Sequence, residues 1–311
     1  MIELMIFRAT PLLAGQLKRL ETKWTLISHA GNLQGKSEGA NIRNKVKSKE
    51  GDLRLQLLEN RVESQLHWCH NILLTRLEMS DSSALLRQIP GILHGFGDKR
   101  ALLPAGLQPY EATRPVKKQV HGVRIVDVSG PGQACGEADG LFTSAPGILL
   151  TVYTADCLPV IFSRKDGQHI GVVHAGWRGL IDGILEQVAA RITLSGDTAD
   201  WVASVGPAAG ACCYEVSQEL NDTFIQRLDL PASLISPRPR HLDLAAIAQA
   251  KLRALGFTET DRAGRCTICT PDETGQGFHY TSFRRNSHQR ALNPSHPGIS
   301  GRNQQSGIII L

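Results

Sequence analysis

Cys157 and His174 carry sulfur and nitrogen atoms that can bind a metal ion or take part in nucleophilic catalysis, and each follows an apolar segment. They lie in the stretch TADCLPVIFSRKDGQHIGVVHAGWRG, residues 154–179. His169 and His174 are five positions apart, so on a strand their side chains point to opposite faces and only one can face a given site. His174 is the better candidate because it ends its apolar run and is followed by the glycines of AGWRG. His121, in KQVHG, precedes another apolar segment and is a third candidate.

One cysteine and two histidines make a three-ligand zinc set, which leaves a fourth position for water, as in catalytic rather than structural zinc sites. Zinc bound in this way lowers the pKa of its water toward ~7 and so supplies hydroxide at neutral pH. The residues alone leave two alternatives open. In the first, each residue is an isolated polar or small core residue, since no short ligand pair such as HxxxH joins them. In the second, Cys157 is a nucleophile and His174 is its base.

Arginine residues near these candidates could bind an anion. Arg178 lies in AGWRG at the expected start of a helix, where free amides and the positive end of the helix dipole favour negative charge. Arg284 and Arg285, in SFRR, carry guanidinium groups that match phosphate geometry. The alternative for each arginine is a surface ion pair. Asp156, next to Cys157, either orients a metal ligand or acts as a general base.

The remaining cysteines do not form a recognisable zinc ribbon. Cys266 and Cys269, in CTIC, have no second pair at the required spacing, and we expect them to end a strand as buried small residues. We expect the vicinal pair Cys212 and Cys213 to be packing residues near the site. Seven cysteines without a regular framework favour reduced thiols and a cytoplasmic location.

The pattern after about residue 89 predicts a compact domain of strands and helices. Short apolar runs bounded by Gly, Pro or Asp predict strands at 124–128, 147–154, 159–164, 169–174 and 201–206. Helical spacing of apolar residues predicts one helix over 180–192 and a second over 243–256. Asp243 is the expected N-cap of the second helix and Gly256 its C-terminal stop.

The first 84 residues differ from the rest of the chain. Residues 35–52 are polar and rich in turn-forming residues, whereas residues 53–79 could form an amphipathic helix. We therefore divide the chain into an extension, 1–84, that is poorly ordered or a small helical appendage, and a catalytic domain, 85–311.

Composition excludes several classes of partner. The chain has 41% hydrophobic and 20% charged residues, as expected of a globular protein, and its 5% aromatic content argues against stacking on nucleic acid. No apolar run is long enough to span a bilayer. The net charge is +5, but residues 1–84 hold 12 Lys and Arg against 9 Asp and Glu, so charge says little about the main domain. We expect neither a nucleic-acid nor a membrane partner.

Six motifs occur in an order that resembles the YfiH-like, or laccase-domain, family: KQVHG, ADGLFTS, TADCLPVIF, VVHAGWRG, GPAAGACCYEV and SFRR. This family has been called multicopper polyphenol oxidoreductase and is now described as purine nucleoside phosphorylase. The similarity covers roughly residues 89–311. It implies an α+β fold, a mixed α/β sandwich with flanking helices that is similar to a toxin deamidase with a Cys–His pair.

The resemblance also implies a site and an activity. His121, Cys157 and His174 would bind one zinc ion, with Cu²⁺ as an alternative. Adenosine, inosine, guanosine and methylthioadenosine would be split by phosphate, and adenosine would also be deaminated. The chain departs from the family in its N-terminal extension, in the segment after GFGDKR and in a longer polar segment after SFRRN.

Laccase chemistry requires several copper ions held by His-x-His pairs. The chain has 11 histidines and no such pair, so we exclude this activity. A cysteine hydrolase or deamidase, and a metal-stabilised binding or editing factor, remain as alternatives to the phosphorylase.

Overall fold

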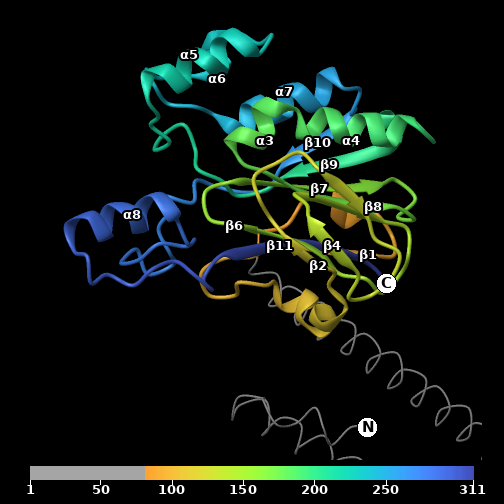
Figure 1. Ribbon diagram of the computed structural model, residues 1–311. Coiled ribbons are helices and arrows are strands. Elements are labelled where there is room, and N and C mark those ends of the chain that lie inside the picture. The colour runs from red at the N-terminus through yellow and green to blue at the C-terminus, as the bar shows by residue number, and fades with distance from the viewer. Residues whose placement is uncertain (1–80) are drawn as a thin grey trace, which may run out of the picture. The chain divides into compact units, whose positions relative to one another are not determined.

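Two β-sheets packed face to face, with helices over the outer face of the larger one, form the domain (Figure 1). The structure, a computed structural model, describes residues 81–311. The strands of the large sheet are, in sheet order, β10 Glu259–Arg262, β9 Trp201–Val205, β7 Leu158–Arg164, β8 Ile170–Ala175, β5 Gly140–Thr143 and β3 Ile125–Asp127. The small sheet is β1 Ile92–Phe96, β11 Gln304–Ile310 and β6 Leu150–Thr154, and a separate pair is β2 Val116–Lys118 with β4 Ala134–Glu137.

Helices α3, α4 and α7 lie on the opposite side of the large sheet from β1, β6 and β11 (Figure 1). The α-helices are α3 Trp177–Asp182, α4 Ile184–Thr193, α5 Gln218–Arg227, α6 Ala232–Ile235, α7 Leu244–Ala254 and α8 Phe283–Leu292. The 3-10 helices are η2 Leu86–Gln88, η3 Ala105–Thr113 and η4 Thr198–Asp200. This arrangement confirms the expected α+β sandwich with flanking helices.

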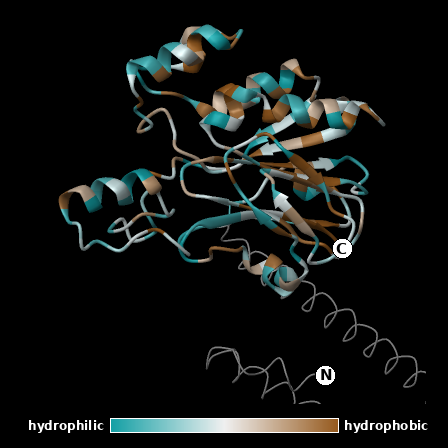
Figure 2. Cartoon of the chain, in the orientation of Figure 1, coloured by the Kyte–Doolittle hydropathy of each residue, from teal (hydrophilic) through white to brown (hydrophobic). Residues whose placement is uncertain are grey.

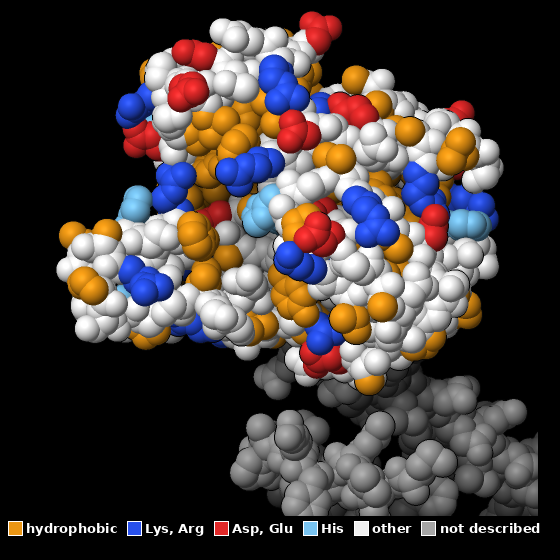
Figure 3. All heavy atoms as spheres, viewed as in Figure 1, with side chains coloured by type: hydrophobic (Ala, Val, Ile, Leu, Met, Phe, Trp, Pro, Cys, Tyr) orange, Lys and Arg blue, Asp and Glu red, His pale blue; other side chains and the backbone are white. Residues whose placement is uncertain are grey.

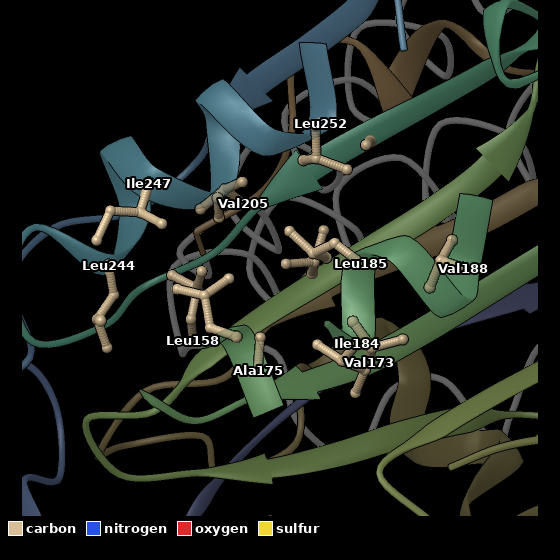
Figure 4. Close-up of a cluster of buried hydrophobic side chains, with 14 of the residues drawn as sticks. Leu158, Val173, Ala175, Ile184, Leu185, Val188, Val205, Leu244, Ile247 and Leu252 are labelled. Carbon is tan, nitrogen blue, oxygen red and sulfur yellow. The ribbon is translucent and has the colours of Figure 1, made fainter. Parts of the chain in front are cut away.

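The large sheet is buried on both faces, which explains why β7 and β8 read as nearly continuous apolar runs in the sequence (Figure 2). On the helix side, side chains of α4 and α7 pack against those of β7, β8 and β9 (Figure 4). Between the sheets, Phe96, Val152, Ile161, Val172 and Ile308 belong to a second cluster. Burial of each large aliphatic side chain contributes about 1.5–3 kcal/mol.

The helix expected over 180–192 is divided in two. Gly183 has φ +98° and ends α3 in the left-handed conformation before α4 begins. The helix expected over 243–256 is confirmed as α7. The side chain of Asp243 accepts a hydrogen bond from the backbone N–H of Ala246 at 2.9 Å, and Gly256 has φ +92° just beyond the helix.

Asp81 and Ser83, which the sequence places in the N-terminal extension, contact the described domain. The carbonyl of Asp81 accepts the N–H of Phe96 at 2.9 Å, and Ser83 Oγ donates to Asp261 Oδ2 at 2.7 Å. Residues 1–80 of the predicted extension lie outside the described residues, and the boundary at residue 84 stays a prediction. Among residues 81–311 there is no helix with the length and apolar character needed to cross a membrane.

Candidate metal centre

His121, Cys157 and His174 converge at one site. Their donor atoms all lie within 4.8 Å of one another. His174 is near the end of β8, Cys157 lies in the connection from β6 to β7, and His121 lies in the turn before β3. The two imidazole rings meet edge to face, with centroids 4.8 Å apart. The structure thus brings together the three residues that the sequence suggested as ligands.

Unusual backbone conformations place two parts of this site. Asp156 has φ +90°, which turns the chain sharply from the small sheet into the large one immediately before Cys157. His121 has φ +63°. Non-glycine residues in the left-handed region cost about 1–3 kcal/mol each and are concentrated at functional sites. The strain at Asp156 and His121 therefore marks this site as more than a packing arrangement.

Asp139, immediately before β5, fixes both histidines. Its Oδ1 lies 2.8 Å from Nδ1 of His174, and its carboxylate accepts the backbone N–H groups of His121 and Gly122, each at 2.9 Å. A carboxylate on Nδ1 leaves Nε2 of His174 free for a metal ion. The sequence analysis gave an orienting role to Asp156 and missed Asp139, although the motif ADGLFTS contained it.

The electrostatics suit a cation. Burial, together with the carboxylates of Asp156 and Asp139, raises the pKa of the Cys157 thiol to about 12. Burial lowers the pKa of His174 more than the hydrogen bond to the Asp139 carboxylate raises it, so the imidazole is neutral at neutral pH, which is its metal-binding form. For Asp139, burial raises the pKa, but the hydrogen bonds from His174 and from backbone amides lower it overall. A metal ion would convert the thiol to the thiolate.

Gly176 is packed against all three candidate ligands. A Cβ atom there would lie 3.0 Å from His121 Cδ2, 3.3 Å from Cys157 Sγ and 3.4 Å from His174 Cε1. A side chain at this position would push against all three groups, so glycine lets the backbone lie close to the donors. One thiolate and two imidazoles in this arrangement fit a zinc ion with an open position.

The three donors line a cavity of about 570 Å³, a size typical of small-molecule sites. Four aromatic side chains also line it: Tyr153, Trp177, Tyr214 and Phe283. Figure 3 shows the hollowed face, where hydrophobic side chains gather with histidine and with Lys or Arg. The cavity therefore offers ring-stacking surfaces beside the candidate metal ligands.

Two of the predicted arginines reach this cavity. Arg178 and Arg284 both line it. The Arg178 guanidinium stacks on the ring of Trp177, 4.5 Å from its centroid, and Arg284 Nη1 donates to the carbonyl of Glu215 at 2.7 Å. Helix α3 has only 6 residues, so its dipole contributes less to anion binding than the sequence suggested. Positive charge at the cavity comes chiefly from the guanidinium groups.

Arg285 is not among the residues that line the cavity. Its Nη1 donates to the carbonyls of Thr267 and Ile268 at 3.1 and 2.6 Å, and its guanidinium stacks on Phe278. We therefore propose that Arg285 supports the loop over 266–269 instead of contacting substrate, in contrast to the sequence-based expectation.

Asp156 lines the cavity, and its carboxylate accepts three hydrogen bonds. The donors are Thr267 Oγ1 at 2.6 Å, Ser282 Oγ at 3.0 Å and the backbone N–H of Arg284 at 2.7 Å. Asp156 thus joins the β6–β7 connection to the start of α8. These contacts fix its position next to Cys157, and its role as a base stays a prediction.

The structure contradicts the expectation for the four remaining motif cysteines. Cys266 and Cys269 do not end a strand, and Cys269 is exposed, as is Cys212. Together with Cys213, these residues form a second group whose sulfur atoms all lie within 4.8 Å of one another. Sequence spacing could not reveal this group because the two pairs come from different loops.

Comparisons with known proteins agree with the fold and the motifs. Residues 98–291 match the family model described as multi-copper polyphenol oxidoreductase laccase. A purine nucleoside phosphorylase of Xylella fastidiosa is 40% identical over 164 residues, which are 50% of this chain and 62% of that protein. The purine nucleoside phosphorylase YfiH of Escherichia coli is 33% identical over 196 residues, 62% of this chain and 76% of that one. The first of these alignments thus spans less than two thirds of the relative.

Solved structures support the same fold. The Bacillus licheniformis hypothetical protein YfiH has a TM-score of 0.58 at 22% identity, covering 71% of this chain and 93% of that one. YlmD from Geobacillus stearothermophilus also has a TM-score of 0.58, at 24% identity, with 72% and 93% covered. At these identities the likeness concerns the fold alone.

Proposed function

The chain belongs to the multi-copper polyphenol oxidoreductase laccase family, and on that basis we propose that it is a zinc-dependent purine nucleoside phosphorylase. Curated relatives that carry this name support the proposal. The observation that carries it is a single cavity lined by His121, Cys157 and His174, by two guanidinium groups and by four aromatic rings. We infer a cytoplasmic location from the reduced cysteines.

Phosphorolysis requires one site for phosphate and one for the purine. A phosphate oxygen bonds to C1′ of the ribose, the C1′–N9 bond breaks, and the purine leaves with a proton. Arg178 and Arg284 would hold the phosphate, since guanidinium groups match its oxygens and stabilise its charge. Trp177 and Tyr214 would stack on the base. A bound zinc ion would supply a Lewis acid beside the reacting atoms.

Broad specificity for purine nucleosides fits a cavity whose aromatic walls bind the purine ring mainly by stacking. We propose adenosine, inosine, guanosine and methylthioadenosine as substrates, with deamination of adenosine as a second reaction. The deamination is favoured by the three-ligand set, which leaves an open coordination position next to the cavity. Asp156, adjacent to Cys157, is the candidate base for this reaction.

A cysteine hydrolase is the alternative enzyme, with Cys157 as nucleophile and His174 as base. One feature argues against it: a second histidine, His121, completes a metal-ligand set. The contact between Asp139 and Nδ1 of His174 fits either enzyme, because it leaves Nε2 free to bind a metal ion or to accept a proton. A binding or editing factor in which the metal is structural is the non-enzymatic alternative.

The test is incubation of zinc-loaded protein with each nucleoside, with and without phosphate. We expect release of the free base together with ribose 1-phosphate, both dependent on phosphate and abolished in the His121→Ala/Cys157→Ala variant. Base release without phosphate dependence, or no release from any nucleoside, would reject the phosphorylase. Inactivation by a thiol alkylator but not by a zinc chelator would favour the cysteine hydrolase.

A further inference from the structure

The four-cysteine group lies at one edge of the large sheet, outside the candidate catalytic centre. Strands β9 and β10 are parallel neighbours, so their C-terminal ends meet at the same edge. The loop after β9 carries Cys212 and Cys213, and the loop after β10 carries Cys266 and Cys269. Sheet topology therefore explains how thiols 57 positions apart, those of Cys212 and Cys269, come to lie 3.5 Å from each other.

The two loops are held in register by the backbone as well. Ala208 and Cys266 form a parallel bridge, and the N–H of Thr267 donates to the carbonyl of Ala208 at 2.9 Å. At Gly210, a Cβ atom would lie 3.3 Å from Cys266 Cβ and 3.4 Å from Cys212 Sγ. The backbone bridge and the close packing at this glycine hold the two loops against each other where the sulfur atoms converge.

The geometry matches one tetrahedral ion. All four sulfur atoms lie within 4.8 Å of one another, and zinc–sulfur bonds of ~2.3 Å place tetrahedral sulfur ligands about 3.8 Å apart. The structure assigns all four as free thiols, and the Cys212–Cys269 separation of 3.5 Å is well beyond a disulfide bond of ~2.05 Å. We propose that Cys212, Cys213, Cys266 and Cys269 bind a second zinc ion, which is structural.

Neighbouring groups offset the charge of such a centre. Four thiolates around one Zn²⁺ carry a double negative charge, and the N–H of Gly210 donates to Cys266 Sγ at 3.3 Å. Arg238 Nη1 donates to the carbonyl of Cys212 at 3.1 Å. Arg285 donates to the carbonyls of the two residues between Cys266 and Cys269. One guanidinium group thus contacts the backbone of each cysteine loop, so positive charge lies close to the proposed thiolates.

The ion would fasten the two loops that shape the catalytic cavity. Tyr214, which follows Cys213 directly, lines that cavity. Thr267, between Cys266 and Cys269, is fully buried and donates to the Asp156 carboxylate. A closed four-thiolate site leaves no position for substrate, as in structural zinc sites. The second zinc therefore acts on catalysis only through the position of these loops.

Metal content of the purified full chain tests this proposal. We expect two zinc ions per chain in the wild type and in Cys135→Ser, a control cysteine outside both groups. We expect one in Cys266→Ser/Cys269→Ser and one in His121→Ala/Cys157→Ala. Iron, or no metal, in the His121→Ala/Cys157→Ala protein would overturn the second site, and so would full zinc content in Cys266→Ser/Cys269→Ser.

A second measurement applies even where the double serine variant does not fold. Co²⁺ titrated into the metal-free His121→Ala/Cys157→Ala protein should give the intense sulfur-to-cobalt charge transfer of four thiolates, saturating at one ion per chain. Absence of this band, with Cys212 and Cys269 recovered as a disulfide after rapid alkylation, would overturn the proposal in favour of a redox pair. Neither result bears on phosphorolysis, because the nucleoside assay monitors the other centre.

Discussion

Asp139 is the residue on which the geometry of the candidate catalytic centre depends most. Its carboxylate contacts Nδ1 of His174 and accepts a hydrogen bond from the backbone N–H of His121, in the turn before β3. In Asp139→Asn the size is kept, but the negative charge opposite the imidazole is lost. We expect a 10–100-fold weaker zinc affinity at this centre, measured by competition with a chelator, since this is the usual cost of removing such a partner.

The matched control for Asp139→Asn is Asp127→Asn, which removes an exposed carboxylate that pairs with Arg191. Zinc affinity should be unchanged in this control. Equal affinity in Asp139→Asn and the wild type would show that the carboxylate orients the backbone only and contributes nothing to the metal ligand.

Arg178 allows the two proposed reactions to be separated. Its guanidinium lines the cavity, but it is not one of the three metal donors. In Arg178→Ala we expect the Michaelis constant for phosphate to rise by at least about tenfold, because roughly one charge-assisted hydrogen bond to phosphate is lost. Zinc content and adenosine deamination should be less affected. Equal loss of both activities at saturating phosphate would mean that Arg178 binds the nucleoside instead.

At the scale of elements, strongly patterned segments were predictable and edge segments were not. Strands β7 and β8 and helix α7 have long apolar runs or a clear N-cap, so their local signals agree with their final structure. In contrast, β4 and β10 have 4 residues each and no apolar run: β4 is largely exposed and β10 is entirely polar. Their conformation comes from pairing with neighbouring strands, which no local pattern encodes. The same holds for the four-cysteine group, since it depends on the parallel pairing of β9 with β10.

The attachment of the segment before η2 to strand β1 should depend on pH. Nε2 of His94 accepts the N–H of Ser83 at 3.0 Å, and burial lowers the pKa of His94 to about 4. Between pH 6.5 and 4 the unfolded chain binds a proton that the native protein does not, so lowering the pH through this range reduces stability. We expect the free energy of unfolding to fall by on the order of 2 kcal/mol more in the wild type than in His94→Gln.

Urea denaturation at a series of pH values measures this difference. His288→Gln, which replaces an exposed histidine of α8, is the control and should follow the wild-type profile. Parallel profiles for His94→Gln and the wild type would show that the hydrogen bond from Ser83 does not hold His94 neutral.

At the scale of the whole molecule, sequence motifs located the residues of the candidate metal centre but not the residues that support them. The three donors lie at or near the ends of strands, and the sheet order brings those strand ends together. Asp139 and Tyr214 were missed because their roles depend on what lies opposite them in space. The contacts of Asp81 and Ser83 with the domain are also long-range, so no local sequence pattern indicates them.

We expect the folded domain to start close to Asp81. Residues 1–80 precede the family match, which begins at residue 98, and their polar, unpatterned stretch predicts no core of their own. We expect a chain that starts at Asp81 to keep the thermal stability and the nucleoside activity of the full chain. A chain that starts at Ile89 loses the buried side chains of Ser83 and Leu86, and we expect it to be less stable by about 2–5 kcal/mol. Thermal and urea unfolding of both truncated chains distinguishes these cases. If the chain starting at Asp81 fails to fold, residues before it contribute to the core, whereas equal stability of both chains would show that the segment 81–88 contributes little.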